Sequence, residues 1–412
     1  GWVHMKISAK KVIGLFFITT FLMGIVFGVI SVADTDKRNY DPKGISLDTS
    51  CGDSDYSFAE WRGDYHRYLY IQASDYYTLG YLTGQYLAYQ IVAFDNLIDY
   101  FIDAYNLDFQ LILYFASQYE IPEPYYTEML GIADATGLNY YEILLQHVFL
   151  DVYYGILIPL QISQQNIGAC TGFAVKSSRR NVVHGQTMDF GLVFFPTFAW
   201  VHHKVLGKNE VFSLRMGASS LAIGKNKRVS CTQNLIQSWA FADFGVPTSL
   251  KSRIAFETCQ TAKDFISIIT SSLTCYFNYI VCDKKGNAIA LETAPNIVTI
   301  SYIGRRGFAV RTNTYVTEDL KIFLLDPIYS IARQNKAEEL IVNTLNQRKK
   351  FTIKNCIAVE SYNDYTDASI LRYDNPENLL GMWTLASFAS SFRTKGYFGI
   401  GTPAIAQEKI PI

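Results

Sequence analysis

A cysteine stands at the start of a predicted β-strand near the middle of the chain, in the segment NIGACTGFAV. A second predicted strand, NVVHGQTMDF, follows a polar turn, so residues 170–190 are predicted to form a hairpin. With the turn at 176–181, Cys170 lies opposite about Thr187, and Asp189 lies beside the Cys170 end of the first strand. Residues opposed across such a hairpin are roughly 5 Å apart and diagonal neighbours about 7 to 8 Å. A thiol and a carboxylate are therefore expected to meet at this end of the hairpin.

The residues alone leave two interpretations of this pair open. In the first, Cys170 is a small buried hydrophobe and Asp189 is a turn or capping residue. In the second, the chain is cut between Ala169 and Cys170, and the freed α-amine is the base for the thiol. An α-amine has a pKa of roughly 7.7 to 8.0 and a thiol of roughly 8.5, so little free energy separates the neutral pair from ammonium and thiolate. Asp189 would then orient the amine and stabilise its charged form.

Acyl transfer also needs hydrogen-bond donors for the oxyanion. Two neutral amide side chains stand beside predicted strand ends: Asn234 in VSCTQNLI and Asn313 in RTNTY. Asparagine at a strand end is equally common as turn chemistry, so each residue keeps that alternative. A papain-like mechanism would need a histidine well downstream of the cysteine, but the last histidine is His203.

The sequence contains no motif for a metal or a cofactor. P-loop, H-E-x-x-H and G-x-S-x-G motifs are absent from the chain. His202 and His203 are adjacent on a predicted strand and so face opposite sides, which prevents them from chelating one metal ion. His184 lies in the hairpin and is interpreted as structural. We therefore expect a site built from side chains alone, without a metal or cofactor.

The part of the chain before the hairpin is predicted to be helical. Apolar residues recur at helical spacing over residues 56–165. Gly137 suits the left-handed position after one helix, and Asn139 with Glu142 has the spacing of a capping box for the next.

The part after the hairpin changes to the period of β-strands. Residues 278–292 and 297–313 each have turn residues between β-branched runs and predict two further hairpins. Helices are expected at 262–272 and 328–345, and strands return at 381–392 and 396–402. Hairpins interspersed with helices indicate an α+β fold, in which antiparallel sheets are covered by helices.

The N-terminus and the composition indicate a cellular location. Residues 12–33 carry no charge and follow three lysines, and Ser31-Val32-Ala33 fits a cleavage site. Residues 5–33 are therefore expected to be a cleaved signal peptide or a retained single-pass membrane anchor. Both send the protein into the secretory pathway, to a lysosome-like or extracellular compartment, where an odd count of seven cysteines leaves at least one without an internal partner. A net charge of −1 gives no electrostatic basis for nucleic-acid binding.

ACTGFAV followed by NVVHGQTMDFG resembles the cysteine-first hairpin of the N-terminal-cysteine (Ntn) hydrolases. That group includes choloylglycine hydrolases, acid ceramidase and acyl-CoA:6-aminopenicillanate acyltransferase, and the acyltransferase branch is the more similar. IGKNKRVSCTQNLI and RTN are similar to the segments bearing the two oxyanion asparagines, which gives those roles to Asn234 and Asn313. SIARQNKAEELI is similar to a helix with a catalytic-site arginine, which corresponds to Arg333. Gln186, before the Thr-Met-Asp segment, is expected to contact the substrate.

The resemblance implies a four-layer αββα core and self-cleavage between Ala169 and Cys170. Residues 34–169 would then be a helical propeptide that stays bound as a small subunit, and 170–412 the catalytic subunit. The implied activity is hydrolysis or transfer of a linear amide of an apolar acyl group, on a small-molecule or lipid-like substrate. Two positions depart from the group. Choloylglycine hydrolases and acid ceramidase have arginine where Gln186 stands, and Thr314 replaces a histidine of the acyltransferases, so bile-acid and ceramide specificity are not implied.

Two other functions remain open from the sequence. A phospholipase-B-like enzyme would use the same residues on ester bonds. A membrane-anchored binding protein would keep the fold without the chemistry, and its chain would stay intact across the Ala169–Cys170 bond.

Overall fold

A computed structural model gives the structure of the chain over residues 56–160, 168–178, 180–305, 307–325, 328–347, 350–374, 381–401, 403 and 408–412. The predicted signal peptide or anchor at 5–33 lies outside these residues, as does Cys51. The six cysteines within them are all buried and free of disulfide bonds. None of the helices in this part of the chain combines the length and the apolar character that crossing a membrane requires.

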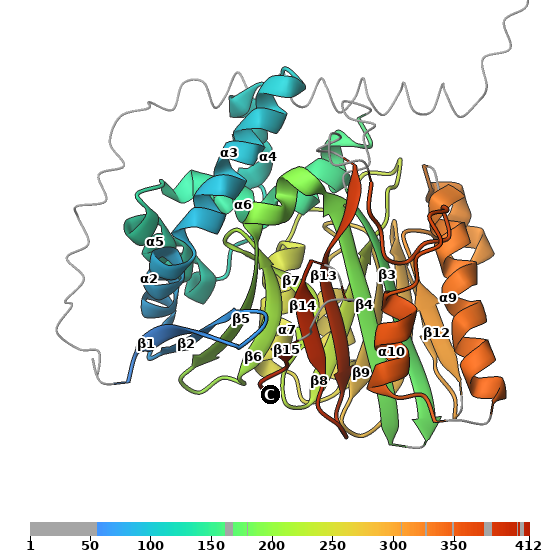
Figure 1. The fold of residues 1–412 in the computed structure, drawn as a ribbon. Coiled ribbons are helices and arrows are strands. Elements are labelled where there is room, and N and C mark those ends of the chain that lie inside the picture. Colours follow the sequence, from blue (N-terminus) through green and yellow to red (C-terminus); the bar gives the residue numbers. More distant parts are fainter. Residues whose placement is uncertain are drawn as a thin grey trace, which may run out of the picture.

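Two β-sheets lie at the centre of the molecule (Figure 1). The larger sheet, sheet A, has nine strands in the order β1-β2-β5-β6-β7-β8-β9-β10-β11. Its strands are β1 (Phe58–Arg62), β2 (Tyr68–Ala73), β5 (Phe198–Val205), β6 (Val211–Met216), β7 (Ser219–Lys225), β8 (Val229–Leu235), β9 (Phe277–Asp283), β10 (Ala288–Ala294) and β11 (Ile297–Tyr302). Neighbouring strands are antiparallel except β2 and β5, which are parallel.

The smaller sheet, sheet B, has six strands in the order β12-β3-β4-β13-β14-β15. They are β3 (Gly168–Ser178), β4 (Asn181–Gly191), β12 (Phe308–Arg311), β13 (Met382–Ser391), β14 (Tyr397–Ile400) and β15 (Glu408–Lys409). The strand that carries Cys170 is therefore an inner strand, paired on both sides by β12 and β4.

Helices cover the outer faces of both sheets. The helical elements are α2 (Tyr76–Tyr86), α3 (Ala88–Ala104), α4 (Phe109–Ser117), α5 (Glu123–Thr136), α6 (Tyr140–Val152), the π-helical turn η2 (Tyr153–Leu157), the 3-10 turns η3 (Leu192–Thr197) and η4 (Glu318–Phe323), α7 (Thr248–Thr258), α8 (Ala262–Ile269), α9 (Ile328–Asn346) and α10 (Ile353–Glu360). Helices α9 and α10 pack on sheet B, while α7 and α8 pack on sheet A, and β3 contacts β8 where the sheets face each other. This order of layers is αββα, so the predicted α+β fold and its four layers are confirmed.

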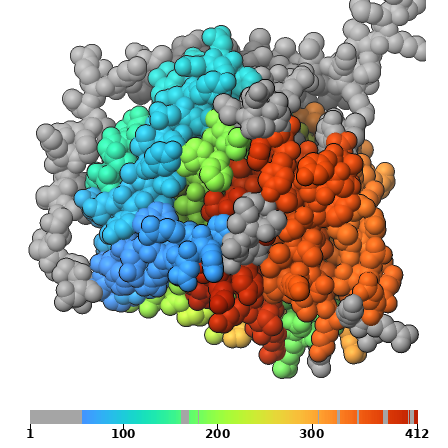
Figure 2. Space-filling view, viewed as in Figure 1, coloured from blue at the N-terminus to red at the C-terminus, as the bar shows by residue number. Residues whose placement is uncertain are grey.

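The N-terminal helices form a separate group beside the sheets. Figure 2 shows residues of this group together with β1 and β2, coloured blue to cyan, on the same face as the orange α9–α10 region, with red C-terminal residues between them. The predicted helix ends are correct. Gly137 ends α5 with φ 77°, and Asn139 and Glu142 form the capping box of α6.

Two strands, β1 and β2, lie in the segment that was predicted to be helical. The sequence of β2, YLYIQA, is buried at five of its six positions because β2 is paired with β1 and β5. A strand that is buried on both faces has a continuous run of apolar residues. Hydrophobic periodicity cannot distinguish such a run from a buried helix. The predicted helical character of residues 56–165 is thus correct for α2 to α6 and wrong for β1 and β2.

The predicted hairpin over residues 297–313 is also wrong. Its first strand, β11, pairs with β10 in sheet A, whereas its second, β12, pairs with β3 in sheet B. The short turn between them therefore carries the chain from one sheet to the other. Local sequence cannot show this, since turn residues between two β-branched runs fit either connection.

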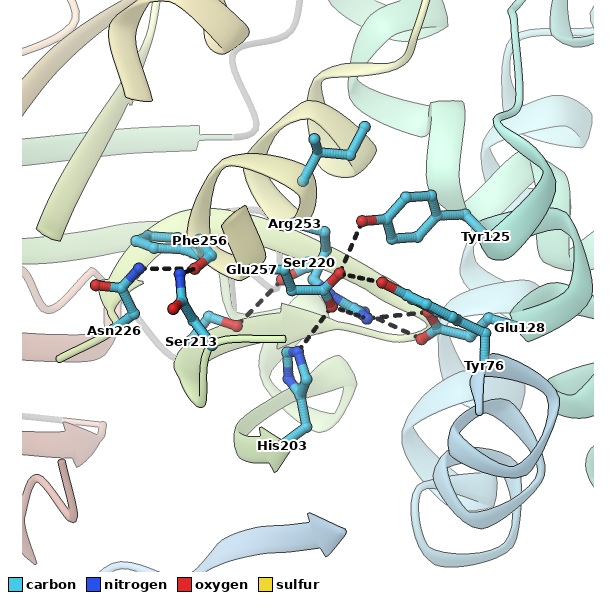
Figure 3. A network of polar contacts seen from close by, with 12 residues as sticks. Tyr76, Tyr125, Glu128, His203, Ser213, Ser220, Asn226, Arg253, Phe256 and Glu257 are labelled. Carbon is cyan, nitrogen blue, oxygen red and sulfur yellow. Dashed lines mark hydrogen bonds and ion pairs between the residues drawn. The ribbon is translucent and has the colours of Figure 1, made fainter. Parts of the chain in front are cut away.

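A buried polar network joins the N-terminal helices to the rest of the fold (Figure 3). Arg253 on α7 donates to both oxygens of Glu128 on α5 at 3.0 Å and to Glu257 at 2.8 Å. Tyr76 and Tyr125, from α2 and α5, donate to the other oxygen of Glu257 at 2.7 and 2.8 Å. Burial would raise the pKa of Glu128, but the guanidinium groups of Arg253 and Arg215 lower it overall, so the carboxylate is charged.

Candidate active site around Cys170

Cys170 lies inside sheet B and is only 3% exposed. It pairs with Met188, and Ala169 pairs with Asp189, so the predicted pairing with Thr187 is one residue off. The strands continue into the predicted turn, and a register irregularity between Lys176 and Ser178 shifts the pairing. A β-bulge of this kind cannot be read from the hydrophobic pattern.

The thiol of Cys170 points into the space between the two sheets. A Cβ placed on Gly172, two residues along the strand, would meet the side chains of Asn234 and Thr232 on β8. Because side chains alternate along a strand, Cys170 shares that face, while Thr171 faces the helices on the other side. The Cys170 side chain and the polar side chains of β8 therefore both lie in the space between the two sheets.

The thiol is protonated in the uncut chain. Burial, followed by the charge of Asp189, raises the pKa of the Cys170 thiol to about 12. Hydrogen bonds from the Asp189 backbone and the Gln186 side chain, and the charge of Arg333, act in the opposite direction without cancelling the burial. Such a thiol is a weak nucleophile, and a nearby base would increase its reactivity.

Arg333 is buried, not a surface residue of its helix. It is 1% exposed and reaches from α9 to the Cys170 carbonyl, to which Nη1 donates at 2.5 Å. The same nitrogen donates to Thr171 Oγ1 at 2.9 Å, and Nη2 donates to Asn313 Oδ1 at 2.9 Å and to Ser330 Oγ at 3.2 Å. Burial lowers the pKa of Arg333 to about 10, which leaves the guanidinium charged at neutral pH.

Asn313 holds the backbone nitrogen of Cys170. Its Oδ1 accepts the Cys170 N–H at 2.7 Å, and its Nδ2 donates to the Leu235 carbonyl at 2.8 Å. The side-chain oxygen therefore faces the nucleophile, whereas an oxyanion donor would present its nitrogen. In this arrangement Asn313 is an acceptor for the nitrogen that cleavage would turn into an amine.

Asn234 differs from Asn313 because its side-chain amide makes no hydrogen bond to the described residues. It is fully buried on β8, and neither its Nδ2 nor its Oδ1 has a hydrogen-bond partner among the described residues. An amide buried without a partner costs free energy, so such groups are rare and mark strain or a function. Its Oδ1 lies against Gly172 of β3, two residues along the strand from Cys170, so the amide lies near the face of β3 that carries the thiol.

Asp189 lies on the other face of sheet B. Its Oδ1 accepts a hydrogen bond from Thr384 on β13 at 2.7 Å, and its Oδ2 has no partner in the described part of the chain. Burial raises the pKa of Asp189 to about 6, although the charges of Arg333 and Arg372 lower it. A half-satisfied buried carboxylate beside the Ala169 end of β3 is suited to receive a cation.

Gln186 connects the two sheets. Its Nε2 donates to the Gln233 carbonyl at 2.5 Å, and its Oε1 accepts the Gln233 N–H at 2.9 Å. Both ends of the amide are thus used by the residue next to Asn234. This bonding fits a residue that positions β8, and the substrate contact expected from the sequence stays a prediction.

Two polar residues near the site were not anticipated from the sequence. Asn278 on β9 donates to the carbonyls of Thr312 at 3.0 Å and Thr314 at 2.6 Å, which hold Asn313 from both sides. Thr384 fixes Asp189. In each case the sequence shows only a polar residue in an otherwise apolar strand. That pattern does not reveal which residue is its hydrogen-bond partner.

Comparisons with known proteins agree with the predicted resemblance. Residues 230–387 match the family model of acyl-coenzyme A:6-aminopenicillanic acid acyl-transferase, a range that includes Asn234, Asn313 and Arg333 but not Cys170 or Asp189. A search of curated proteins gave no match.

Solved structures similar to this chain include an acylase and a hydrolase from bacteria. Penicillin V acylase from Agrobacterium tumefaciens has 12% sequence identity and a TM-score of 0.38, and the match covers 56% of this chain and 83% of that one. A variant of conjugated bile acid hydrolase from Clostridium perfringens has 10% identity and a TM-score of 0.40, with 56% and 89% of the two chains covered. On the family match, the resemblance to the acyl-coenzyme A:6-aminopenicillanic acid acyl-transferases that the sequence predicted is confirmed over residues 230–387.

Proposed function

We propose that this protein is a self-cleaving cysteine amidohydrolase or acyltransferase whose nucleophile is Cys170. The observation that carries the proposal is the set of hydrogen bonds that hold the Cys170 peptide group. Asn313 accepts its N–H and Arg333 donates to its carbonyl, while the thiol lies on the face of β3 that packs against β8, where the amide of Asn234 has no partner among the described residues. Any buried peptide group needs hydrogen-bond partners, but here two of them are an amide side chain and a charged guanidinium from distant parts of the chain, which suits a residue whose nitrogen must stay in place once it is freed.

The first step is cleavage of the Ala169–Cys170 bond. Sγ of Cys170 attacks the Ala169 carbonyl carbon, the C–N bond breaks, and the thiol proton passes to the released nitrogen. Water then hydrolyses the thioester, which leaves a carboxylate on Ala169 and a free thiol and α-amine on Cys170. Asn313 Oδ1 already accepts from that nitrogen, and Asp189 at the paired position supplies the negative charge that an ammonium group needs.

The mature site then acts on an amide in the same way. The α-amine takes the thiol proton, the thiolate attacks the substrate carbonyl, and the proton is passed to the leaving amine. The acyl thioester is released to water in hydrolysis or to a second amine in transfer. We assign the oxyanion donor to Nδ2 of Asn234, because Asn313 presents its oxygen.

An apolar acyl group is supported by the residues next to the hairpin. Phe190 follows Asp189 and packs on Phe194 of η3, with ring centroids 5.1 Å apart. Phe194 stacks on Phe101 of α3 at 5.8 Å, and Phe101 also lines a cavity of about 30 Å³ among the N-terminal helices. The lining of that cavity is apolar apart from tyrosine hydroxyls, so apolar side chains pack without interruption from the hairpin into the proposed small subunit.

The test compares wild type with Cys170→Ala by intact mass and N-terminal sequencing. Wild type is expected to give a new N-terminus reading Cys-Thr-Gly-Phe, and Cys170→Ala to remain intact. Cys282→Ala, which removes another buried thiol from β9, is the matched control and should cleave as wild type does. An uncut wild-type chain at both mildly acidic and neutral pH would refute the enzyme and leave a binding protein. Assays with an amide and an ester of the same acyl group then separate an amidohydrolase from an ester hydrolase.

A further inference from the structure

A basic cleft lies at the end of the two sheets that is remote from Cys170. Its volume is about 630 Å³, and it is lined by the β7–β8, β9–β10 and β13–β14 turns together with residues 409–412. These segments belong to both sheets, so the cleft lies between the ends of sheet A and sheet B. The cleft lining contains six basic residues: Lys225, Lys227, Lys284, Arg393, Lys395 and Lys409.

Lys225 is the unusual member of this group, because it is buried. It is 5% exposed at the end of β7, and its Nζ lies 5.0 Å from the centre of the Phe392 ring. No hydrogen-bond acceptor or carboxylate is found for its ammonium group among the described residues. Burial, together with the charge of Lys284, lowers the pKa of Lys225 to about 8, so the group still carries its charge at neutral pH.

The carboxylates near the cleft do not balance these charges. Glu210 pairs with Lys227 at 2.7 Å, on the solvent side. Glu408 accepts the backbone N–H groups of Asp64 and Tyr65 at 2.8 and 2.9 Å. The Phe392 ring offsets part of the charge of Lys225, but an ammonium group held among other cations is costly unless an anion accompanies it.

We propose that this cleft binds a multivalent phosphate group, with Lys225 as its buried cation. The shared chemistry is that of a diphosphate or phosphate monoester, carried either by a soluble molecule or by a phospholipid headgroup. Several cations at short range favour a ligand with more than one negative charge, and Phe392 leaves room for an apolar part beside it.

The cleft is separate from the candidate active site. On β13, Ala386 pairs with Met188, which is opposite Cys170, and Ser391 at the cleft pairs with Val183. Five residues along a strand span about 17 Å. The proposal therefore does not rest on the function proposed for Cys170, and its variants should leave cleavage of the chain unchanged.

The experiment titrates the purified protein with inorganic pyrophosphate in a calorimeter and repeats it for three variants. Wild type is expected to bind, with an affinity that falls as salt is added. Lys225→Met keeps the buried aliphatic packing and should bind at least about tenfold more weakly, which corresponds to the loss of one buried charge-assisted contact. Lys284→Gln at the exposed rim should also weaken binding, while Lys208→Met on the β5–β6 turn is the matched control and should bind as wild type does.

Vesicles distinguish the two sources of the phosphate. Vesicles of phosphatidylcholine containing phosphatidic acid are compared with vesicles of phosphatidylcholine alone, each with and without pyrophosphate. Binding to the phosphatidic acid vesicles that Lys225→Met weakens and pyrophosphate displaces identifies a headgroup, and pyrophosphate binding without vesicle binding identifies a soluble ligand. The proposal is overturned if wild type binds neither probe, or if Lys225→Met binds both as tightly as wild type does.

Discussion

At the residue scale, the backbone and the side chain of Cys170 have opposite environments. The peptide group is held by charged and polar partners, while the thiol is desolvated and its pKa is raised to about 12. Desolvation keeps the thiol protonated before cleavage, which makes it a weak nucleophile. A free α-amine on the same residue would supply the missing base, so the proposed cleavage would also activate the nucleophile.

Replacing Arg333 tests this arrangement directly. Arg333→Met removes the donors to the Cys170 carbonyl and to Asn313, and charge-assisted bonds of this kind contribute about 1.5 to 3 kcal/mol each. Appearance of the Cys170 N-terminus should slow by roughly 10- to 100-fold. Arg305→Met, at an exposed position, should leave the rate unchanged. Equal rates for wild type and Arg333→Met would remove the arginine from the mechanism.

His184 provides a pH-dependent prediction. Its ring lies between the sheets, with Ser230 Oγ and Thr232 Oγ1 at 3.0 and 3.1 Å, and burial lowers its pKa to about 3. An unfolded histidine takes up a proton near pH 6.5, whereas the folded one does not, so folding is penalised as the pH falls below about 6.5.

The comparison is between wild type and His184→Gln, which can keep a hydrogen bond but does not titrate. Relative to the variant, wild type should lose about 1.4 kcal/mol of unfolding free energy per pH unit below about pH 6.5. Urea midpoints measured between pH 7 and pH 5 give this difference. Parallel curves for the two proteins would show that His184 titrates normally in the folded state.

At the scale of elements, the contact between β3 and β8 depends on a residue without a side chain. A Cβ on Gly172 would lie 2.7 Å from Oδ1 of Asn234 and 3.0 Å from Oγ1 of Thr232. These distances are too short for carbon, so the strands approach this closely only because position 172 is glycine. The proposed oxyanion donor therefore depends on the packing of two strands from different sheets.

Gly172→Ala should displace Asn234 and impair catalysis more than folding. Overpacking of this size typically costs about 1 to 3 kcal/mol, which a protein of this size can tolerate. Gly304→Ala is the control, because a Cβ there meets no atom within 4 Å. Cleavage rate and thermal midpoint are measured for both variants. Normal cleavage in Gly172→Ala would show that Asn234 is not needed where the structure places it.

At the scale of the whole molecule, the buried network in Figure 3 connects the two proposed subunits. Glu128, Tyr76 and Tyr125 come from residues before Cys170, and Arg253, Glu257 and His203 from residues after it. Cutting the chain at residue 169 would leave these contacts in place. The network therefore supports a small subunit that remains bound after cleavage.

Arg253→Met should weaken this association. It leaves Glu128 and Glu257 buried without their main partner, and breaking a buried pair in this way costs about 3 to 5 kcal/mol. The cleaved variant should separate into two fragments at a lower urea concentration than cleaved wild type does, as followed by size-exclusion chromatography. Lys263→Met, on the exposed side of α8, is the control. Identical elution of the variant and wild type would show that apolar packing alone holds the fragments together.

Several features were decided by local sequence. The hairpin that carries Cys170, the caps of α5 and α6 and the α+β class follow from residue types at short spacing, because capping, turn formation and strand alternation act over a few residues. The six candidate site residues were named from short segments, and the structure brings Arg333 and Asn313 to the backbone of Cys170.

Other features were decided only by the tertiary structure. The sheet to which β12 belongs, the burial of β2 and the pairing of Cys170 with Met188 depend on partners far along the chain. So does the direction in which Asn313 presents its amide, which is set by the Leu235 carbonyl and by Arg333. A short segment specifies which groups a residue offers, but burial, register and hydrogen-bond partners come from segments that only the folded chain brings together.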